Sequence, residues 1–199
     1  MGLNSLVATD CFSLPLDVKW LVILLVLSSC ALASKETLPD RKVLTLNDPY
    51  FQGKAVFQRL TSRTGFKLSL LNAAGEQLDQ AVFPYAPYQL DTADVNNDGR
   101  TDILVGLIKS TTFDPVEKKR LFILRIDDGQ IRPLWLGSKV CQELVTFKTL
   151  EGGIVQTLEK TKEGKYAIGR YAWQSFGLIL INYVHNEKSF EEAVQLFSS

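Results

Sequence analysis

The sequence predicts an all-β domain made of antiparallel four-stranded units. From residue 42 onward, apolar and polar residues alternate with a period of two, as they do in strands that bury one face. Glycine-containing turn signals separate these runs, and a pattern of about 45 to 50 residues recurs along the chain. The chain has 199 residues, 46% of them hydrophobic, which is enough for one domain with a packed core.

The expected strands are short runs bounded by turn signals. In chain order they cover residues 55–60, 66–71, 77–83, 88–93, 102–108, 120–126, 131–136, 144–149, 154–159, 166–173 and 178–184. The turns are marked by Ala74-Gly75, Asp98-Gly99, Asp127-Asp128-Gly129, Gly152-Gly153 and Glu163-Gly164. Residues 190–196 fit either a further strand or a short helix, because Glu191, Glu192 and Ala193 favour a helix.

Two segments can be laid over each other as repeats. Residues 87–137 and 152–197 both run strand, turn, strand, loop, strand, turn, strand, with Asp98-Gly99 and Glu163-Gly164 at matching turns. A shorter copy spans residues 54–83. Four strands in such a unit are typical of a propeller blade, and closed propellers have about four to eight blades. We therefore expect an open or incomplete β-propeller, or a ring that is completed by association.

The N-terminus carries an export signal. Residues 20–27 (WLVILLVL) are all apolar, but this run is shorter than the roughly 20 residues that a membrane-spanning helix needs. Leu27-Ser28-Ser29-Cys30 resembles a bacterial lipobox, in which Cys30 is lipidated, whereas Ala31-Leu32-Ala33 fits ordinary signal cleavage. We favour the lipoprotein because Cys30 directly follows the apolar run. The expected organisation is a signal peptide and extension at 1–33, a polar tether at 34–41 and the β domain at 42–199.

The composition narrows the range of functions. A formal net charge of zero argues against a nucleic-acid partner. Three cysteines and one histidine leave little for a zinc or thiol site. We expect Cys141 to pack in the core and His185 to lie in a solvated turn. Lys118-Lys119-Arg120 is expected to be a solvated strand end, with contact to anionic lipid as the alternative.

A calcium loop is the strongest chemical signal. Oxygen-bearing side chains occupy positions one, three, five and nine of the segment 94–102, and Gly99 at position six permits the positive φ of a tight reversal. Position seven would contribute a backbone carbonyl. Position twelve is Val105 in an expected strand, so the loop is not an EF-hand. The predicted Ca²⁺ ligands are Asp94, Asn96, Asp98, the carbonyl of Arg100, and Asp102.

The other copies of the repeat lack such a ligand set. We expect Glu159, Thr161, Glu163 and Ala167 to occupy the matching places in the later copy, and Leu60, Ser62, Thr64 and Leu68 in the early one. Lys160, Lys162 and Lys165 also crowd the later loop with positive charge. One metal site is therefore expected.

The sequence Asp-x-Asn-x-Asp-Gly-x-x-Asp followed by Ile-Leu-Val-Gly resembles the calcium loop of FG-GAP/VCBS-type repeats, and the match covers residues 88–108. Such repeats occur in integrin-like propellers and in many bacterial surface proteins. The resemblance implies a propeller-like fold and Ca²⁺ bound by the five residues of the loop.

These observations favour a non-enzymatic calcium-binding lipoprotein at the bacterial membrane surface or in the periplasm, with a protein or glycan as its ligand. Two alternatives stay open. One is an exported hydrolase that acts on glycans or phosphoesters, and the other is a subunit that completes its fold in a larger assembly.

Overall fold

Twelve strands, one α-helix and one short 3-10 helix (Glu151–Gly153) lie in the part of the chain that the computed structural model describes, which is residues 38–61, 64–112, 114–137 and 140–199. Residues 38–199 form one compact unit. The predicted signal peptide, Cys30 and the first half of the predicted tether lie outside the described residues. Among the described residues, no helix is both long enough and apolar enough to cross a bilayer.

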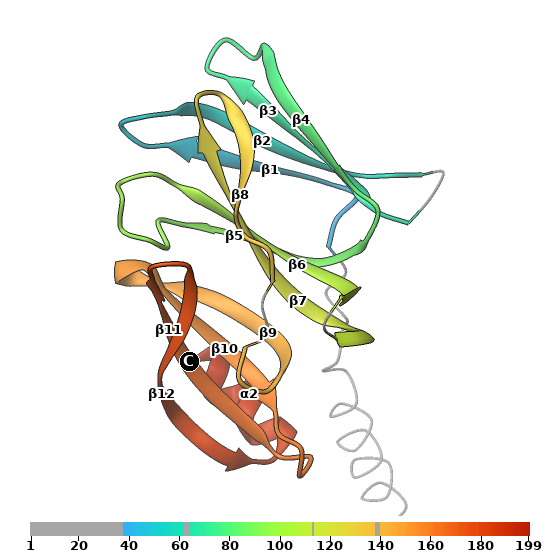
Figure 1. Cartoon of the computed structure of the whole chain (residues 1–199), viewed down its shortest axis with the longest axis vertical. Helices are drawn as coiled ribbons and strands as arrows, with labels where there is room; N and C mark the ends of the chain where they lie inside the picture. The colour runs from blue at the N-terminus through green and yellow to red at the C-terminus, as the bar shows by residue number, and fades with distance from the viewer. Residues whose placement is uncertain (1–37, 62–63, 113, 138–139) are drawn as a thin grey trace, which may run out of the picture. The chain divides into compact units, whose positions relative to one another are not determined.

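The strands form three antiparallel sheets, each a four-stranded meander in chain order (Figure 1). The first sheet contains β1 (Arg41–Asn47), β2 (Gln52–Arg59), β3 (Phe66–Asn72) and β4 (Gln77–Phe83). The central sheet contains β5 (Ala86–Ala93), β6 (Asp102–Thr111), β7 (Asp114–Asp127) and β8 (Gln130–Trp135). The third sheet contains β9 (Glu143–Leu150), β10 (Ile154–Lys160), β11 (Tyr166–Gln174) and β12 (Gly177–Lys188). This confirms the predicted all-β class and the four-stranded antiparallel units.

All eleven predicted strands are present, one further strand was missed, and the structure decides the segment that was left open. The sequence pattern missed β1, whose residues alternate between exposed and buried with Leu44 and Leu46 pointing into the core. Residues 190–196, which fitted either a strand or a helix, lie in helix α2 (Phe190–Ser198). The Ser189 hydroxyl caps this helix by accepting a hydrogen bond from the backbone N–H of Glu192.

Two hydrophobic cores hold the sheets together face to face. The first joins the first and central sheets and is filled by side chains such as Phe57, Phe66 and Val105. The second joins the central and third sheets around Phe147 and Tyr171. Helix α2 packs on the opposite face of the third sheet, where its Ala193 meets Leu158 of β10 and Ile168 of β11. The central sheet is therefore covered on both faces, which explains why the first six residues of β6 are all buried.

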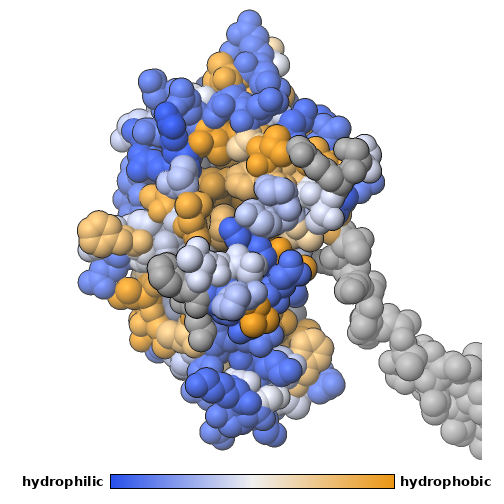
Figure 2. Space-filling model, turned by 45° about the vertical axis from the view of Figure 1, so that its right-hand side comes forward, coloured by the Kyte–Doolittle hydropathy of each residue, from blue (hydrophilic) through white to orange (hydrophobic). Residues whose placement is uncertain are grey.

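Polar side chains join the central and third sheets at their edges. Asp91 accepts hydrogen bonds from the Thr149 backbone N–H at 3.1 Å and from its hydroxyl at 2.9 Å. Gln89 bonds the backbone of Phe147 through both ends of its amide group. These bonds satisfy edge-strand groups that would otherwise lie between two sheets without partners. Elsewhere, Figure 2 shows hydrophobic residues gathered in patches between hydrophilic ones on one face of the molecule.

The predicted repeat matches the central sheet at residues 87–137, but the later copy at 152–197 had the wrong boundaries. Glu163-Gly164 joins β10 to β11, the second and third strands of a sheet, whereas Asp98-Gly99 joins the first and second strands. The true counterparts of the loop at 94–101 are the turns at 48–51 and 151–153. Figure 1 draws these three turns along the same side of the sheets.

Glu159 therefore does not lie in a degenerate metal loop. It is buried in β10, where its carboxylate accepts hydrogen bonds from the hydroxyls of Thr157 at 2.6 Å, Tyr171 at 2.7 Å and Tyr183 at 3.2 Å. The backbone N–H of Gln142 is a fourth donor, at 2.8 Å. These donors satisfy a buried carboxylate that would be costly without them.

Two single-residue expectations were also wrong. Cys141 is exposed in the segment before β9, which is held to the third sheet by a hydrogen bond from the Cys141 backbone N–H to the Tyr171 hydroxyl at 3.0 Å. His185 lies in β12 and not in a turn, since β12 continues to Lys188 and keeps pairing with β11 through several register shifts.

Candidate metal centre

The segment predicted to bind Ca²⁺ forms the loop between β5 and β6. Asp94, Asn96, Asp98 and Arg100 lie in the loop, and Asp102 is the first residue of β6. The chain reverses through two residues with positive φ, Asn97 at 55° and Gly99 at 82°. An asparagine and a glycine are the residue types that adopt this conformation at least cost. The local sequence therefore dictates the shape of the loop.

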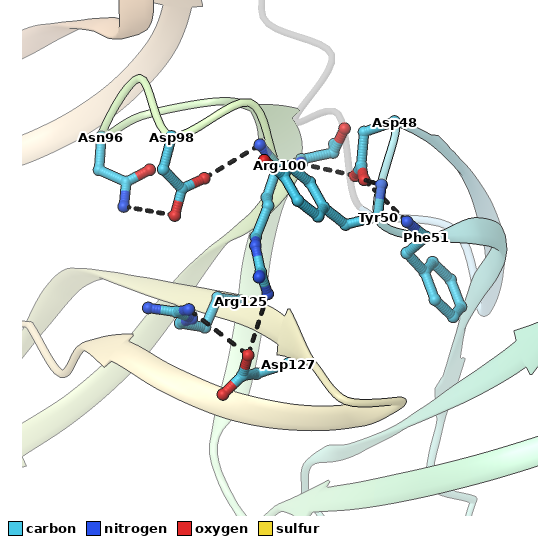
Figure 3. Close-up of polar contacts among 9 residues, drawn as sticks. Asp48, Tyr50, Phe51, Asn96, Asp98, Arg100, Arg125 and Asp127 are labelled. Carbon is cyan, nitrogen blue, oxygen red and sulfur yellow. Dashed lines mark hydrogen bonds and ion pairs between the residues drawn. The ribbon is translucent and has the colours of Figure 1, made fainter.

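Two of the predicted carboxylates bond to the backbone of the loop. Asp94 accepts hydrogen bonds from the backbone N–H groups of Asp98 at 3.0 Å and Gly99 at 2.8 Å. Asp98 accepts from the backbone N–H of Arg100 at 3.0 Å and from the Asn96 side-chain amide at 3.0 Å, as Figure 3 shows. These bonds are Asx-type turns that hold the loop closed.

Two oxygens in the same loop have no donor. Three buried side-chain N or O atoms in the described part of the chain lack a hydrogen-bond partner, and two of them are Asn96 Oδ1 and Asp102 Oδ1. Both belong to the predicted ligand set. Buried acceptors without donors are destabilising, and a bound cation is one of the few groups that would satisfy both. The residues present therefore fit a hard cation at this point.

The electrostatics of Asp102 point the same way. The other carboxylate oxygen of Asp102 accepts a hydrogen bond from the Val95 backbone N–H at 3.1 Å. Burial, together with the negative charges of Asp98 and Asp94, raises the pKa of Asp102 to about 7, against the opposing effects of the Val95 hydrogen bond and of Arg125. An ionised Asp102 is therefore unfavourable unless a positive charge lies beside it.

The structure brings the predicted ligands together only in part. Within the described ranges, no three His, Cys, Asp or Glu side chains converge closely enough to hold a metal by themselves. Asp94 and Asp98 face backbone N–H groups, while Asn96 and Asp102 supply the unpaired oxygens. A bound Ca²⁺ would have to draw on the amide oxygen of Asn96 and on a backbone carbonyl as well as the carboxylates.

Asp48, in the turn between β1 and β2, is a residue that the sequence pattern missed. Its carboxylate accepts from the backbone N–H of Thr101 at 2.8 Å and from those of Tyr50 and Phe51, both at 2.9 Å (Figure 3). Burial raises the pKa of Asp48, but these hydrogen bonds outweigh burial and hold the pKa below its usual value. The first sheet is thus fastened directly to the predicted metal loop.

The side chain of Arg100 strengthens the same junction. Its guanidinium lies 4.5 Å from the centre of the Tyr50 ring and forms an ion pair with Asp127 at 2.9 Å. Sequence reasoning assigned only the carbonyl of Arg100, because the partners of its side chain are 50 and 27 residues away in the chain. The only advance signal was Asp48-Pro49, a dipeptide that favours a turn.

The third sheet also contacts the loop. The side-chain amide of Asn97 donates to the carbonyl of Gly152 at 3.3 Å. Gly153, with a φ of 72°, packs so closely that a Cβ atom there would lie 2.7 Å from the Asp94 carbonyl oxygen and 2.8 Å from that of Val95. The loop between β5 and β6 is thus the meeting point of turns from all three sheets.

No protein-family model matches the chain, and no curated protein matches it.

Proposed function

We propose that this chain is a non-enzymatic calcium-binding module of the FG-GAP/VCBS type, exported in bacteria and used as a surface or periplasmic binding or scaffold protein. The observation that carries the proposal is the pair of buried, donorless oxygens, Asn96 Oδ1 and Asp102 Oδ1, in a loop with calcium-ligand spacing. Asp94, Asn96, Asp98, the Arg100 carbonyl and Asp102 would hold the ion, which supplies positive charge.

The role of the cation would be structural. The loop bonds the turn of the first sheet through Asp48 and the turn of the third sheet through Asn97. An ion that rigidifies the loop would therefore stabilise both junctions, as ligand binding to the folded state does in general. Asp94 and Asp98 already accept hydrogen bonds from backbone N–H groups, which favours a structural over a catalytic role for the loop.

We further propose that the three sheets are the blades of an open propeller. Their meander order and face-to-face packing support this, as does helix α2, which covers the outer face of the third sheet. The lipobox at Cys30 supports a membrane anchor, and the zero net charge supports a partner other than nucleic acid. A protein or a glycan is the proposed ligand.

The calcium proposal is tested by thermal unfolding of the full chain in mild detergent, with chelator or with 2 mM Ca²⁺. Extracellular calcium modules have dissociation constants of roughly 10⁻⁴ to 10⁻³ M, so the expected stabilisation is about 0.7 to 1.8 kcal/mol. This corresponds to a rise in Tm of about 2 to 6 °C for a chain of this size. Mg²⁺ should have a smaller effect, because it requires octahedral geometry and retains its waters.

Matched variants locate the site. Asp98→Asn removes one loop carboxylate and should lose the Ca²⁺-dependent rise. Asp128→Asn removes the same charge from the turn between β7 and β8 and should keep it. An equal rise in both variants, or no rise in the wild type at 10 mM Ca²⁺, would reject the proposed site.

The membrane anchor requires a separate test. Labelled palmitate should enter the wild-type protein and not the Cys30→Ser variant, and the wild type should fractionate with membranes. A mature protein that begins at Ser34 would show ordinary signal cleavage instead.

A further inference from the structure

A cavity of about 150 Å³ lies between the central and third sheets, far from the predicted metal loop. The loop precedes β6 and adjoins the Ile103–Leu124 end of the β6–β7 pairing, whereas the cavity lies at the Lys109–Lys118 end. Its walls come from β7, from β9 with the segment before it, and from the turn between β10 and β11. These elements are brought together only by the stacking of two sheets.

Positive charge dominates the lining. Five basic side chains and two carboxylates face the cavity, which gives a net charge of +3 in a chain whose overall charge is zero. The basic residues are Lys118, Lys119, Arg120, Lys160 and Lys162, and the acidic ones are Asp114 and Glu143. A concave surface lined by one sign of charge concentrates the field of that sign.

The acidic residues do not neutralise this charge. Asp114 is bonded to Arg120 at 2.8 Å and lies 3.5 Å from Lys118, and the hydrogen bond from Arg120 holds the pKa of Asp114 below its usual value. Asp114 therefore forms ion pairs with both Lys118 and Arg120, so one carboxylate is shared by two cations. Glu143 stands opposite Lys160 in the β9–β10 register, yet no carboxylate of the described residues lies within 4.0 Å of the ammonium of Lys160 or Lys162.

The floor of the cavity is apolar. Leu121, Val140 and Leu144 line it and are buried, so the lysines stand around a surface of low polarity. Low polarity strengthens the attraction between an ammonium group and an anion. A cavity of about 150 Å³ can hold a group the size of a benzene ring, so a compact anion with a few carbon atoms fits.

We propose that this cavity binds a phosphate ester. The phosphate would lie among Lys118, Lys160 and Lys162, because lysine binds phosphate as a point charge from several directions. The carbon portion of the ester would pack on Leu121 and Leu144. Lys119 and Arg120 hold their side chains in place through the Val145 carbonyl and Asp114, and add to the local field. The inference does not depend on the calcium proposal, since it concerns the opposite end of the central sheet.

The test uses glycerol phosphate as the probe and isothermal titration of the full chain in detergent without Ca²⁺. Binding should weaken as salt concentration rises, because the attraction is electrostatic. Lys160→Gln combined with Lys162→Gln should weaken binding about tenfold, if each ammonium contributes somewhat less than 1 kcal/mol at a partly exposed site. Both lysines are exposed, so the variant should fold normally, and an unchanged circular dichroism spectrum checks this.

The control removes the same charge elsewhere. Arg41 in β1 and Lys54 in β2 are exposed in the first sheet and do not line the cavity. Arg41→Gln combined with Lys54→Gln should bind within about twofold of the wild type, because remote charges are screened at physiological salt. Equal loss in both double variants, or no binding by the wild type, would overturn the proposal.

A second measurement separates a soluble ester from a lipid headgroup. Cys30→Ser protein, with and without the two cavity substitutions, is mixed with phosphatidylglycerol or phosphatidylcholine vesicles. A loss of phosphatidylglycerol binding confined to the cavity variant assigns the site to an anionic lipid headgroup. Equal vesicle binding by both proteins, together with cavity-dependent binding of glycerol phosphate, assigns it to a soluble ester.

Discussion

Replacing Asp102 by asparagine should stabilise the protein without calcium and remove its response to calcium. Asp102 is buried, and its pKa is raised to about 7 from an ordinary value of 3.8. A rise of about 3 pKa units corresponds to about 4 kcal/mol by which folding disfavours the ionised form at pH 8. Asparagine has nearly the same shape and can still accept from the Val95 N–H, but it carries no charge.

The substitution also brings a cost. The new amide adds a buried N–H donor, which destabilises the fold by about 1 to 3 kcal/mol if it finds no acceptor. Asn96 Oδ1 is an acceptor in the same loop that lacks a donor, which should reduce this cost. In chelator at pH 8, Asp102→Asn should therefore raise the free energy of unfolding by about 2 kcal/mol and Tm by about 4 to 8 °C.

Calcium should narrow the difference in Tm between the two proteins. The wild type should gain about 2 to 6 °C in 2 mM Ca²⁺, whereas Asp102→Asn, with one ligand charge removed, should gain almost nothing. Thermal unfolding followed by circular dichroism measures both effects, with Asp128→Asn as the charge-matched control. An Asp102→Asn protein that is less stable than the wild type in chelator, or that keeps the full calcium response, would refute the reasoning.

Three further predictions concern the same junction. In chelator, the stability of the wild type should fall as pH rises from about 4 to 7, because the folded state retains the Asp102 proton to a higher pH than the unfolded state does. The midpoint of urea unfolding, measured across this pH range, should fall accordingly. Gly153→Ala should destabilise the fold by about 2 to 4 kcal/mol, since its Cβ would collide with the Asp94 carbonyl oxygen. Gly152 has a similar φ, but no atom lies near the position of its Cβ, so Gly152→Ala should lower Tm less than Gly153→Ala does. Asp48→Ala should lower stability by about 2 kcal/mol at pH 7, because the Thr101 N–H loses its acceptor. The stability that the ionised Asp48 contributes is complete above its ordinary pKa of 3.8 and vanishes as pH falls through its lower folded pKa. The difference between variant and wild type in urea unfolding should therefore shrink in acid.

The strands could be predicted because each carries its own evidence. Period-two alternation and glycine turns are local features, and each predicted strand from residue 55 to residue 184 is present. β1 was missed because only Leu44 and Leu46 point inward and the strand follows a polar segment that resembles a tether. The later copy of the repeat was displaced by one strand because Glu163-Gly164 resembles Asp98-Gly99 in composition, while the true counterpart, Gly152-Gly153, carries no ligand side chains.

Only those features of the metal loop that depend on neighbouring residues in the sequence could be predicted. Its reversal at Gly99 and its ligand spacing depend on nine consecutive residues. Its bonds to Asp48 and Gly152 join residues 53 and 55 positions apart, and they exist only because the sheets stack. The lysines of the β10–β11 turn were interpreted as damage to a metal loop for the same reason. The residues that neighbour these lysines in the sequence do not indicate that β7 brings Lys118 to the same cavity.

The burial of the central sheet explains why both candidate sites lie at its ends. A strand whose residues are buried on both faces can present polar groups only where it begins or ends, because burying them elsewhere would leave them without partners. Asp102 opens β6, and Lys118 pairs with Lys109 near the other end of the same hairpin. At each end the turn of a neighbouring sheet completes the site, with Gly152 beside the loop and Lys160 beside the cavity. A ligand at either of these two sites would therefore contact two sheets at once, so its binding energy would also stabilise their packing.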